Sequence, residues 1–461
     1  MKPANAFLQA WEACVARAAR PLPPSAADAA RRSWFDTAAA MACGVSESST
    51  RAAFLSCEPQ AAAPCDVALI LGTASHALDY DDVCMLATCH PSAPIVSALL
   101  ALLPVIRREK PHTTFGEVLG AYALGTETML RLGEWLGFRH YALGFHATST
   151  LGTVGVAAAA AQVLSLQAEQ AQRALAIAAS SASGLRANFG TDTKPLHVGF
   201  AAAAGIRAAL LARAGATASN DVWGAAGFAN AFGGGDPVAA LPWHGDTPWA
   251  LAAPGFEHKR FPSCYLTHRM IVGVLEIRAR QAAHGDERVS IDVELPRGGC
   301  APLKHPRPTT GLQAKFSGPY CAAQAWLDGK VDLASFGDAS VMRAQIQAQM
   351  ERVVVRERDK AGEQLDTAPV KVTVDGSGWS DCIVVDWAPG SLADPMTRDE
   401  LVAKWYDCLN HAGLTDDVDP PLELLDATLA TPAIAVLEPI RKYFVSAIRR
   451  SNGRSPVQAS T

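Results

Sequence analysis

Apolar residues in the first half of the chain fall into long stretches that have the length and composition of helices. Alanine and leucine dominate these stretches, and their small residues would let neighbouring helices pack closely. Alternation of apolar and polar positions, which is typical of strands, is nearly absent before residue 254. The predicted helices are 34–43, 67–78, 93–106, 115–132, 151–164, 168–183 and 200–212. This pattern predicts an all-helical domain, assigned to residues 1–264.

The pattern changes after residue 268, where short runs alternate apolar and polar positions. Strands are predicted at 289–295, 370–374 and 382–385, and helices at 263–283, 320–327 and 341–351. Past residue 395 the helical pattern returns, with Thr397 and Glu400 spaced as a capping box. The chain is therefore predicted to be mainly α with an α+β part. A smaller α+β domain spans 265–395, and C-terminal helices in 396–461 return to the helical domain.

Composition and charge indicate which kinds of binding partner and which cellular compartment suit this chain. The chain has 461 residues, of which 49% are hydrophobic and 18% charged, which suits two globular domains. A net charge of −5 argues against nucleic acid as the main partner. The 11 cysteines form no CxxC pair, which favours a reducing cytoplasm over a disulfide framework or structural zinc. We found no signal-peptide pattern, and the apolar run 94–106 is too short to span a bilayer, so no membrane partner is expected.

An acidic segment follows the second predicted helix. Asp79, Asp81 and Asp82 lie within four residues, with His76 before them and His90 after them. Such carboxylates repel one another, and burial would raise at least one pKa. The cluster suits acid–base chemistry, a capped helix end, or a metal site. A metal-dependent hydrolase using the three aspartates and His90 is therefore an alternative.

Two further polar segments precede apolar helices. His140 and His146 stand before the helix that begins near residue 151, where backbone N–H groups favour an anion and a neutral histidine base. Thr193, Lys194 and His197 lie just before the predicted helix 200–212, and the lysine could hold a carboxylate. His146 could instead only cap its helix, Lys194 could be an exposed loop residue, and His197 could be a core histidine.

The predicted domain boundary carries a fourth cluster. Lys259 and Arg260 are adjacent cations, followed by Cys264, Tyr265 and His268. Clefts between domains are preferred ligand sites. Because Cys264 and His268 are four residues apart, they could share a helix face, and a Cys–His nucleophile is an alternative. No GxSxG or papain-like signature supports that alternative.

Tyr320 begins another predicted helix, where it could donate a proton or orient a carboxylate, or be a half-buried aromatic. The sequence contains no GxGxxG motif, Walker loop or cofactor-lysine motif, so we expect no organic cofactor.

Taken together, these segments resemble the MmgE/PrpD family over residues 37–449. The matching stretches, in order, are 72–82, 90–91, 144–146, 193–197, 259–262 with 268, 315–317, and 389–391 with 394–396. The resemblance implies a large helical domain and a smaller α/β lid domain. It also implies that the last helices of the chain pack back on the helical domain. It also implies a homodimer that acts on a small polycarboxylate without metal or organic cofactor.

The family's pocket residues carry over to particular positions. The implied catalytic residues are Asp79, His90, His146, Lys194, His268 and Tyr320. The predicted substrate-binding residues are Asp82, His140, Thr193, His197, Lys259, Arg260, Cys264 and Tyr265. We expect His146 or Asp79 to act as the base and Lys194 to hold a substrate carboxylate. His90, His268 and Tyr320 would orient the substrate or return a proton on the opposite face.

The shared chemistry implied is removal of a proton beside a carboxylate. Val83 and Cys264 stand where decarboxylase-like members carry threonine and histidine, which weighs against decarboxylation. The prediction is therefore a 2-methylcitrate dehydratase-like lyase. The alternatives are an iminodisuccinate epimerase-like isomerase, a cis-aconitate decarboxylase-like enzyme, and a carboxylate-binding protein without activity.

Overall fold

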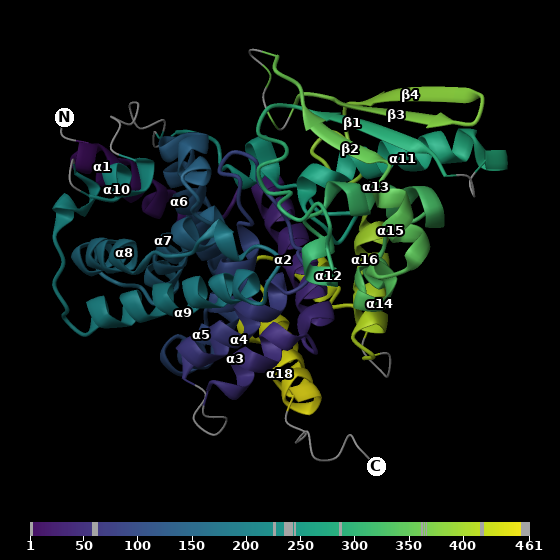
Figure 1. Cartoon of the computed structure of the whole chain (residues 1–461). Helices are drawn as coiled ribbons and strands as arrows, with labels where there is room; N and C mark the ends of the chain where they lie inside the picture. Colours follow the sequence, from purple (N-terminus) through teal and green to yellow (C-terminus); the bar gives the residue numbers. More distant parts are fainter. Residues whose placement is uncertain are drawn as a thin grey trace.

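A computed structural model gives the fold of this protein. It describes residues 3–57, 63–224, 227–234, 243, 246–284, 288–360, 363, 365, 367–414 and 419–452. Figure 1 shows the helical domain on the left, and the sheet with its helices at the upper right. The segment after residue 452, which belongs to the predicted C-terminal helical part, lies outside the described residues.

The helical domain forms from the alanine-rich first half of the chain. Its helices are α1 (Pro3–Ala18), α2 (Pro24–Gly44), α3 (Ser48–Leu55), α4 (Pro64–His76), α5 (Ser92–Glu109), α6 (Phe115–Ala142), α7 (Ala147–Val163), α8 (Ala168–Ser181), α9 (Thr193–Arg213) and α10 (Phe228–Gly233). Sequence signals set several starts. Prolines begin α2 and α4, and Thr114 forms a capping box with Glu117 at α6. Helix α1 was not predicted.

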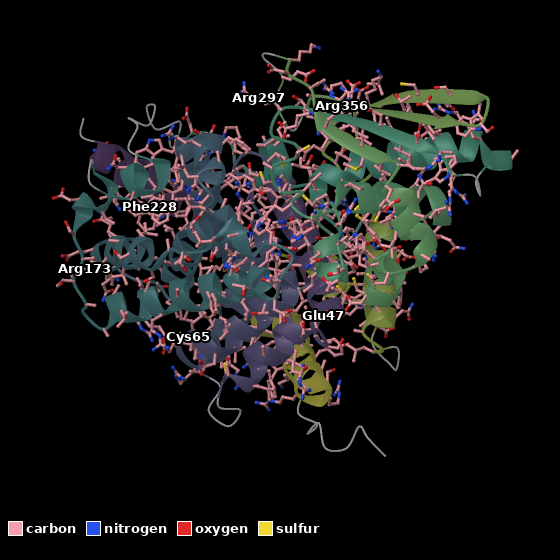
Figure 2. All side chains as sticks on the ribbon, viewed as in Figure 1. Glu47, Cys65, Arg173, Phe228, Arg297 and Arg356 are labelled. Carbon is pink, nitrogen blue, oxygen red and sulfur yellow. The ribbon has the colours of Figure 1, made fainter. Side chains whose placement is uncertain are left out.

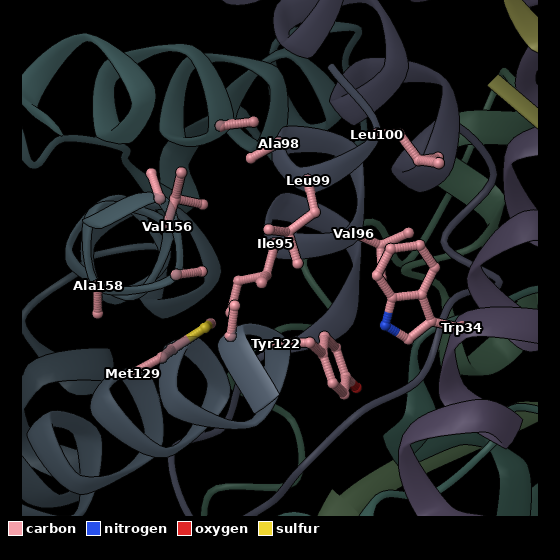
Figure 3. Close-up of a cluster of buried hydrophobic side chains, with 14 of the residues drawn as sticks. Trp34, Ile95, Val96, Ala98, Leu99, Leu100, Tyr122, Met129, Val156 and Ala158 are labelled. Atoms are coloured by element: carbon pink, nitrogen blue, oxygen red, sulfur yellow. The ribbon is translucent and has the colours of Figure 1, made fainter. Parts of the chain in front are cut away.

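The core of this domain is built where α2, α5, α6 and α7 meet. Figure 3 shows Trp34, Ile95, Tyr122, Met129 and Val156 converging there, and each is at most 1% exposed. Helix α7 is buried around nearly its whole circumference. Its small side chains make this possible, because they let several neighbouring helices approach it closely.

A close contact between α4 and α9 determines where the site forms. A Cβ on Gly72 would lie 2.9 Å from Cα of Gly199, and one on Gly199 would lie 2.3 Å from the Leu69 carbonyl oxygen. Only residues without side chains allow this approach. His76 follows Gly72 by four residues and Lys194 precedes Gly199 by five, so the crossing brings both side chains together. Helix α9 is long and apolar enough to cross a membrane, but it packs inside the domain against α4 and α7.

The smaller domain, here called the lid, contains a four-stranded mixed sheet and helices. Its elements are α11 (His268–Arg280), β1 (Ser290–Leu295), α12 (Gly311–Ala314), α13 (Gly318–Asp328), α14 (Asp338–Val341), α15 (Ala344–Met350), β2 (Val353–Glu357), β3 (Val370–Gly376) and β4 (Trp379–Val385). The strand order is β2-β1-β3-β4, with β1 parallel to β2 and antiparallel to β3. The predicted fold class is confirmed, although strand β2 was missed.

The C-terminal helices are α16 (Arg398–His411), α17 (Glu423–Asp426) and α18 (Ala433–Asn452). The predicted capping box of Thr397 and Glu400 starts α16. Apolar residues of α16 and α18, including Trp405 and Phe444, join the core of the helical domain. Outer surfaces carry ordinary ion pairs, such as those of Arg173 on α8 and Arg356 on β2, which lie in different parts of the molecule in Figure 2.

Candidate active site

The acidic loop between α4 and α5 is buried rather than exposed. Asp79, Asp81 and Asp82 are each at most 4% exposed. Asp79 has a φ of 55°, a left-handed conformation that aspartate tolerates better than most residues. The loop pairs with the segment that leads to the lid, because Val83 and Glu257 exchange backbone hydrogen bonds of 2.9 Å. The two domains therefore meet at this loop.

His76 links the loop to α9. Its Nδ1 lies 2.8 Å from Asp81 Oδ1, and its Nε2 lies 2.5 Å from Nζ of Lys194. An ammonium group can only donate, so His76 Nε2 accepts and Nδ1 carries the proton that is donated to Asp81. Burial lowers the pKa of His76 to about 3, so the ring is neutral.

Two lysines bind Asp79, one from α9 and one from the segment that leads to the lid. Lys194 Nζ lies 2.7 Å from Oδ1, and Lys259 Nζ lies 3.0 Å from Oδ2 and donates to the Asp79 carbonyl oxygen at 2.7 Å. Burial raises the pKa of Asp79, but the two ammonium groups outweigh it and hold that pKa well below its usual range. Burial also lowers the pKa of Lys194. The three groups together carry one net positive charge, which suits an anionic ligand.

His146 occupies the N-cap of α7, and one of its nitrogens faces the site without a partner. Its Nδ1 lies 3.1 Å from Nδ1 of His197, whereas its buried Nε2 has no hydrogen-bond partner. Burial, reinforced by the positive charge of Lys194, holds the pKa of His146 well below its usual range. A neutral imidazole with a free Nε2 can exchange a proton with a ligand.

These groups open onto a cavity of about 50 Å³. Its polar lining consists of Asp79, Thr88, His90, Tyr141, His146, Thr148, Lys194, Lys259 and Tyr265. Its apolar lining consists of Val83, Met85, Phe189, Cys264, Leu266, Pro302 and Phe316. His90 lies at the edge of the charged network, with Nδ1 3.2 Å from Asp81 Oδ2 and Nε2 3.6 Å from Asp79 Oδ1.

Seven of the predicted site residues lie outside the lining of this cavity, and three of these seven form contacts elsewhere in the protein interior. Tyr320 lies in the core of the lid, fully buried, and its hydroxyl donates to the Ser335 carbonyl oxygen. Asp82 accepts from the hydroxyl and the backbone N–H of Ser92 on the core side of the loop. His140 is held between Thr150 Oγ1, 2.7 Å away, and the Phe232 carbonyl oxygen, 3.0 Å away.

Other predicted residues lie behind or beside the cavity. His268 is completely buried between the rings of Phe261 and Tyr265, outside the cavity lining. Arg260 lines a separate surface cavity, and Thr193 begins α9 without reaching the lining. His197 contacts His146 through the two Nδ1 atoms and does not line the cavity. Cys264 and Tyr265 line the cavity, but Cys264 faces no histidine within hydrogen-bond distance in the described structure, which gives the Cys–His alternative no support.

Several residues of the site were not in the predicted set. His76 and Asp81 were quoted as part of the acidic segment, and their place beside Lys194 depends on the α4–α9 crossing. Burial lowers the pKa of Lys315 to about 8, and this residue lines a small adjoining cavity with His76 and Lys194. The sequence signal that could have identified Lys315 is its place in the Lys-Phe-Ser stretch 315–317, which matches the family.

The acidic cluster can be tested against the metal alternative. Donor atoms of His76, Asp79, Asp81 and His90 lie within 4.8 Å of one another. However, His76 Nε2 and Asp79 Oδ1 are occupied by the Lys194 ammonium group, which a cation would have to displace. Asp82, which the metal alternative requires, binds Ser92 instead. The network therefore fits charge pairing better than metal coordination.

Comparison with known sequence families agrees with this geometry. Residues 13–240 match the MmgE/PrpD N-terminal domain, and residues 261–419 match the MmgE/PrpD C-terminal domain. The chain belongs to the MmgE/PrpD family. The family resemblance predicted from the sequence is thereby confirmed, and the members of this family are enzymes.

Several proteins that are similar to this chain are named for one activity. The chain is 33% identical to the cis-aconitate decarboxylase of Homo sapiens over 63% of this chain and 61% of that protein. It is 28% identical to the Mus musculus enzyme of the same name over 74% of this chain and 71% of that protein. The cis-aconitate decarboxylase of Aspergillus terreus is 24% identical over 82% of this chain and 83% of that protein. The chain thus matches less than two thirds of the human protein's length.

Proposed function

We propose that this MmgE/PrpD enzyme is a lyase that decarboxylates a small unsaturated polycarboxylate of the cis-aconitate type. The reaction would pass through a carbanion beside a carboxylate and need neither metal nor organic cofactor. The observation that carries the proposal is one cavity in which the free Nε2 of the neutral His146 accompanies Lys194 and Lys259. The named relatives support decarboxylation over the dehydration that we expected from Val83 and Cys264.

Each group would have a separate role. Lys194 and Lys259 would hold a substrate carboxylate, since together with Asp79 they carry net positive charge in a mostly apolar cavity. When carbon dioxide leaves, the bonding electron pair stays on carbon and is delocalised into the remaining unsaturated carboxylate. His146 Nε2–H would then donate the proton that replaces carbon dioxide. One proton is consumed for each carbon dioxide released.

Dehydration of a hydroxy acid is the second candidate, supported by the same neutral histidine acting as the base. His146 Nε2 would remove the proton beside the carboxylate, and hydroxide would leave from the neighbouring carbon. Tyr265 lines the same cavity, but its hydroxyl donates to Glu257 at 2.7 Å, so it would have to release Glu257 before it could donate to the departing oxygen.

The test is turnover in D2O by the chelator-treated full-length protein. Cis-aconitate, 2-methylcitrate, citrate and iminodisuccinate are supplied separately, and proton NMR is combined with measurement of carbon dioxide. We expect carbon dioxide in equal amount to product, with one solvent deuterium on each product molecule. Alkene without carbon dioxide would instead support dehydration, and deuterium entering unchanged iminodisuccinate would support epimerisation. No change in any acid, or activity that returns only with added metal, would overturn the proposal.

A further inference from the structure

Helix α16 carries a buried lysine, Lys404, whose contacts lead to the active site. The helix packs against α2 of the helical domain and against the lid segment Leu333–Phe336. Lys404 is 2% exposed, and its Nζ lies 2.7 Å from Asp36 Oδ1. It also donates to the carbonyl oxygens of Tyr80, at 2.7 Å, and Lys259, at 3.0 Å. An ammonium group has three N–H donors, so these contacts use all of them.

The two carbonyl oxygens belong to residues that hold Asp79 in place. Tyr80 directly follows Asp79, whose φ of 55° is a left-handed conformation. Lys259 binds the same aspartate with its side chain, whose Nζ lies 3.0 Å from Oδ2 and 2.7 Å from the Asp79 carbonyl oxygen. The Lys404 ammonium group therefore joins the backbone next to Asp79 to the backbone of the lysine that pairs with it.

The cation is the donor on which both carbonyl oxygens depend. Within the described part of the chain, no backbone N–H donates to the carbonyl oxygen of Tyr80 or of Lys259. Buried carbonyl oxygens without a donor are unfavourable, and two that face one point repel each other. Loss of the ammonium group would therefore let the acidic loop separate from the segment that leads to the lid. Lys259 would then lose its fixed position against Asp79.

We propose that Lys404 is a positioning residue, which keeps Asp79 and Lys259 paired at the charged end of the cavity. The inference rests on the proposed function, because the cation of this pair would hold the substrate carboxylate. Lys404 does not line the cavity, so it acts on a ligand only through the two segments that it joins. Asp36 balances its buried charge, so the positive charge of the site stays on the cavity side.

A charge-neutral pair of substitutions tests the role of the ammonium group. Lys404→Met alone would leave the buried Asp36 carboxylate without a cation, which is strongly destabilising, so Asp36→Asn accompanies it. We expect kcat/KM for cis-aconitate to fall about 100-fold, because a small displacement of a charged group slows the chemical step strongly. A thermal melt verifies the fold of this paired variant. Unchanged kcat/KM in the folded paired variant would overturn the proposal.

The matched control is the same exchange at another buried ion pair of the helical domain. Glu127→Gln with Arg131→Met removes a pair on α6 whose Oε1 and Nε atoms are 2.8 Å apart, outside the cavity lining. This control should keep kcat/KM within about threefold, since neither residue contacts Asp79 or Lys259. An equal loss of activity in the control would show that general destabilisation causes the effect, and would overturn the proposal.

A double-mutant cycle separates positioning from a merely structural role. In Lys259→Gln enzyme, the cation that Lys404 positions is absent. Adding Asp36→Asn with Lys404→Met should then lower kcat/KM by less than about fivefold further. A merely structural role predicts a further loss of about 100-fold in this background as well. That result would contradict the proposal.

Hydrogen exchange gives a readout that needs no substrate. Val83 and Glu257 exchange backbone hydrogen bonds between the same two segments. Their amides should exchange at least about 10-fold faster in the paired variant, while amides of α7 stay protected. Faster exchange, together with no turnover of any acid by the unaltered protein, would refute the proposed function but support the positioning role. Unchanged exchange at both amides would overturn the positioning role whatever the activity.

Discussion

The two walls of the cavity come from different domains and differ in chemistry. The helical wall supplies the titratable Asp79, His90, His146 and Lys194, beside Thr88, Tyr141, Thr148 and the apolar Val83, Met85 and Phe189. The lid wall consists of Cys264, Tyr265, Leu266, Pro302 and Phe316, which are mostly apolar. Lys259 belongs to the segment between the domains and binds Asp79. Under the proposed function, the helical wall would perform the chemistry and the lid wall would select the shape of the substrate.

The difference follows from how each wall is held. The helical wall is fixed by helix ends that meet through a glycine contact and by a network of charged hydrogen bonds. Lys404 on α16 extends this network, because its ammonium group donates to Asp36, to the Tyr80 carbonyl oxygen and to the Lys259 carbonyl oxygen. The side chains that proton transfer requires in precise positions are thus held by packed helices and by a charged hydrogen-bond network.

Removing a charge from the helical wall should have the largest effect. Lys194→Gln keeps a donor for Asp79 but loses the cation, so we expect kcat/KM for cis-aconitate to fall about 1,000-fold, a loss of roughly 4 kcal/mol of transition-state stabilisation. Steady-state kinetics measures this. A thermal melt within a few degrees of the unaltered protein would show that the fold remains, and unchanged kcat/KM would contradict the role of the helical wall.

Acid should destabilise the helical domain before the lid. Burial lowers the pKa of His76 to about 3 and those of His140 and His197 to about 4, so the native state binds fewer protons than the unfolded chain below about pH 6.5. Stability is therefore complete above that pH and falls by about 1.4 kcal/mol per pH unit for each such histidine as pH decreases. Asp82, whose pKa burial raises well above its usual range, offsets one of them.

Hydrogen exchange at pH 7 and pH 5, with rates corrected for intrinsic pH dependence, measures this effect. Peptides from α4, α7 and α9 should lose protection at pH 5, whereas those from β1 and β3 should change less. Equal or greater loss in the strands would contradict the unequal distribution of buried neutral histidines between the two domains.

Changes in the lid wall should affect binding rather than chemistry. Leu266→Ala removes apolar contact from the cavity, so we expect KM to rise about 10-fold with kcat within about threefold, as expected when apolar contact with the substrate is lost. Val274→Ala is the matched control, because it truncates an apolar lid side chain in the domain core away from the cavity. If Leu266→Ala lowered kcat and left KM unchanged, the lid wall would contribute to the chemical step, which contradicts the comparison.

The smallest effect on activity is expected at Tyr320. Its hydroxyl bonds to the Ser335 carbonyl oxygen inside the lid core, so Tyr320→Phe should leave kcat/KM within about twofold. It should lower the free energy of unfolding by about 1 kcal/mol or more through the lost hydrogen bond. Chemical denaturation and steady-state kinetics together measure this. A loss of activity above 10-fold with normal stability would show that Tyr320 takes part in catalysis after all.

Sequence patterns predicted the two kinds of domain because helical composition and strand alternation are local properties. They missed β2, since Val353–Glu357 directly follows a predicted helix and is stabilised by pairing with the distant β1. They also selected Asp79, His90, His146 and Lys194, which the fold brings to one cavity. They did not select His76, because its contact with Lys194 depends on the Gly72–Gly199 crossing. The homodimer and the cytoplasmic location stay predictions.

The most direct test of the division between the two walls is a single-turnover experiment at saturating cis-aconitate. The rate of carbon dioxide release is measured for the unaltered enzyme, His146→Gln and Phe316→Leu, each with a normal thermal melt. The account predicts at least a 100-fold lower rate for His146→Gln, because the proton donor is lost, and a rate within about threefold for Phe316→Leu. A rate for His146→Gln close to that of the unaltered enzyme, or a larger loss in Phe316→Leu, would contradict it.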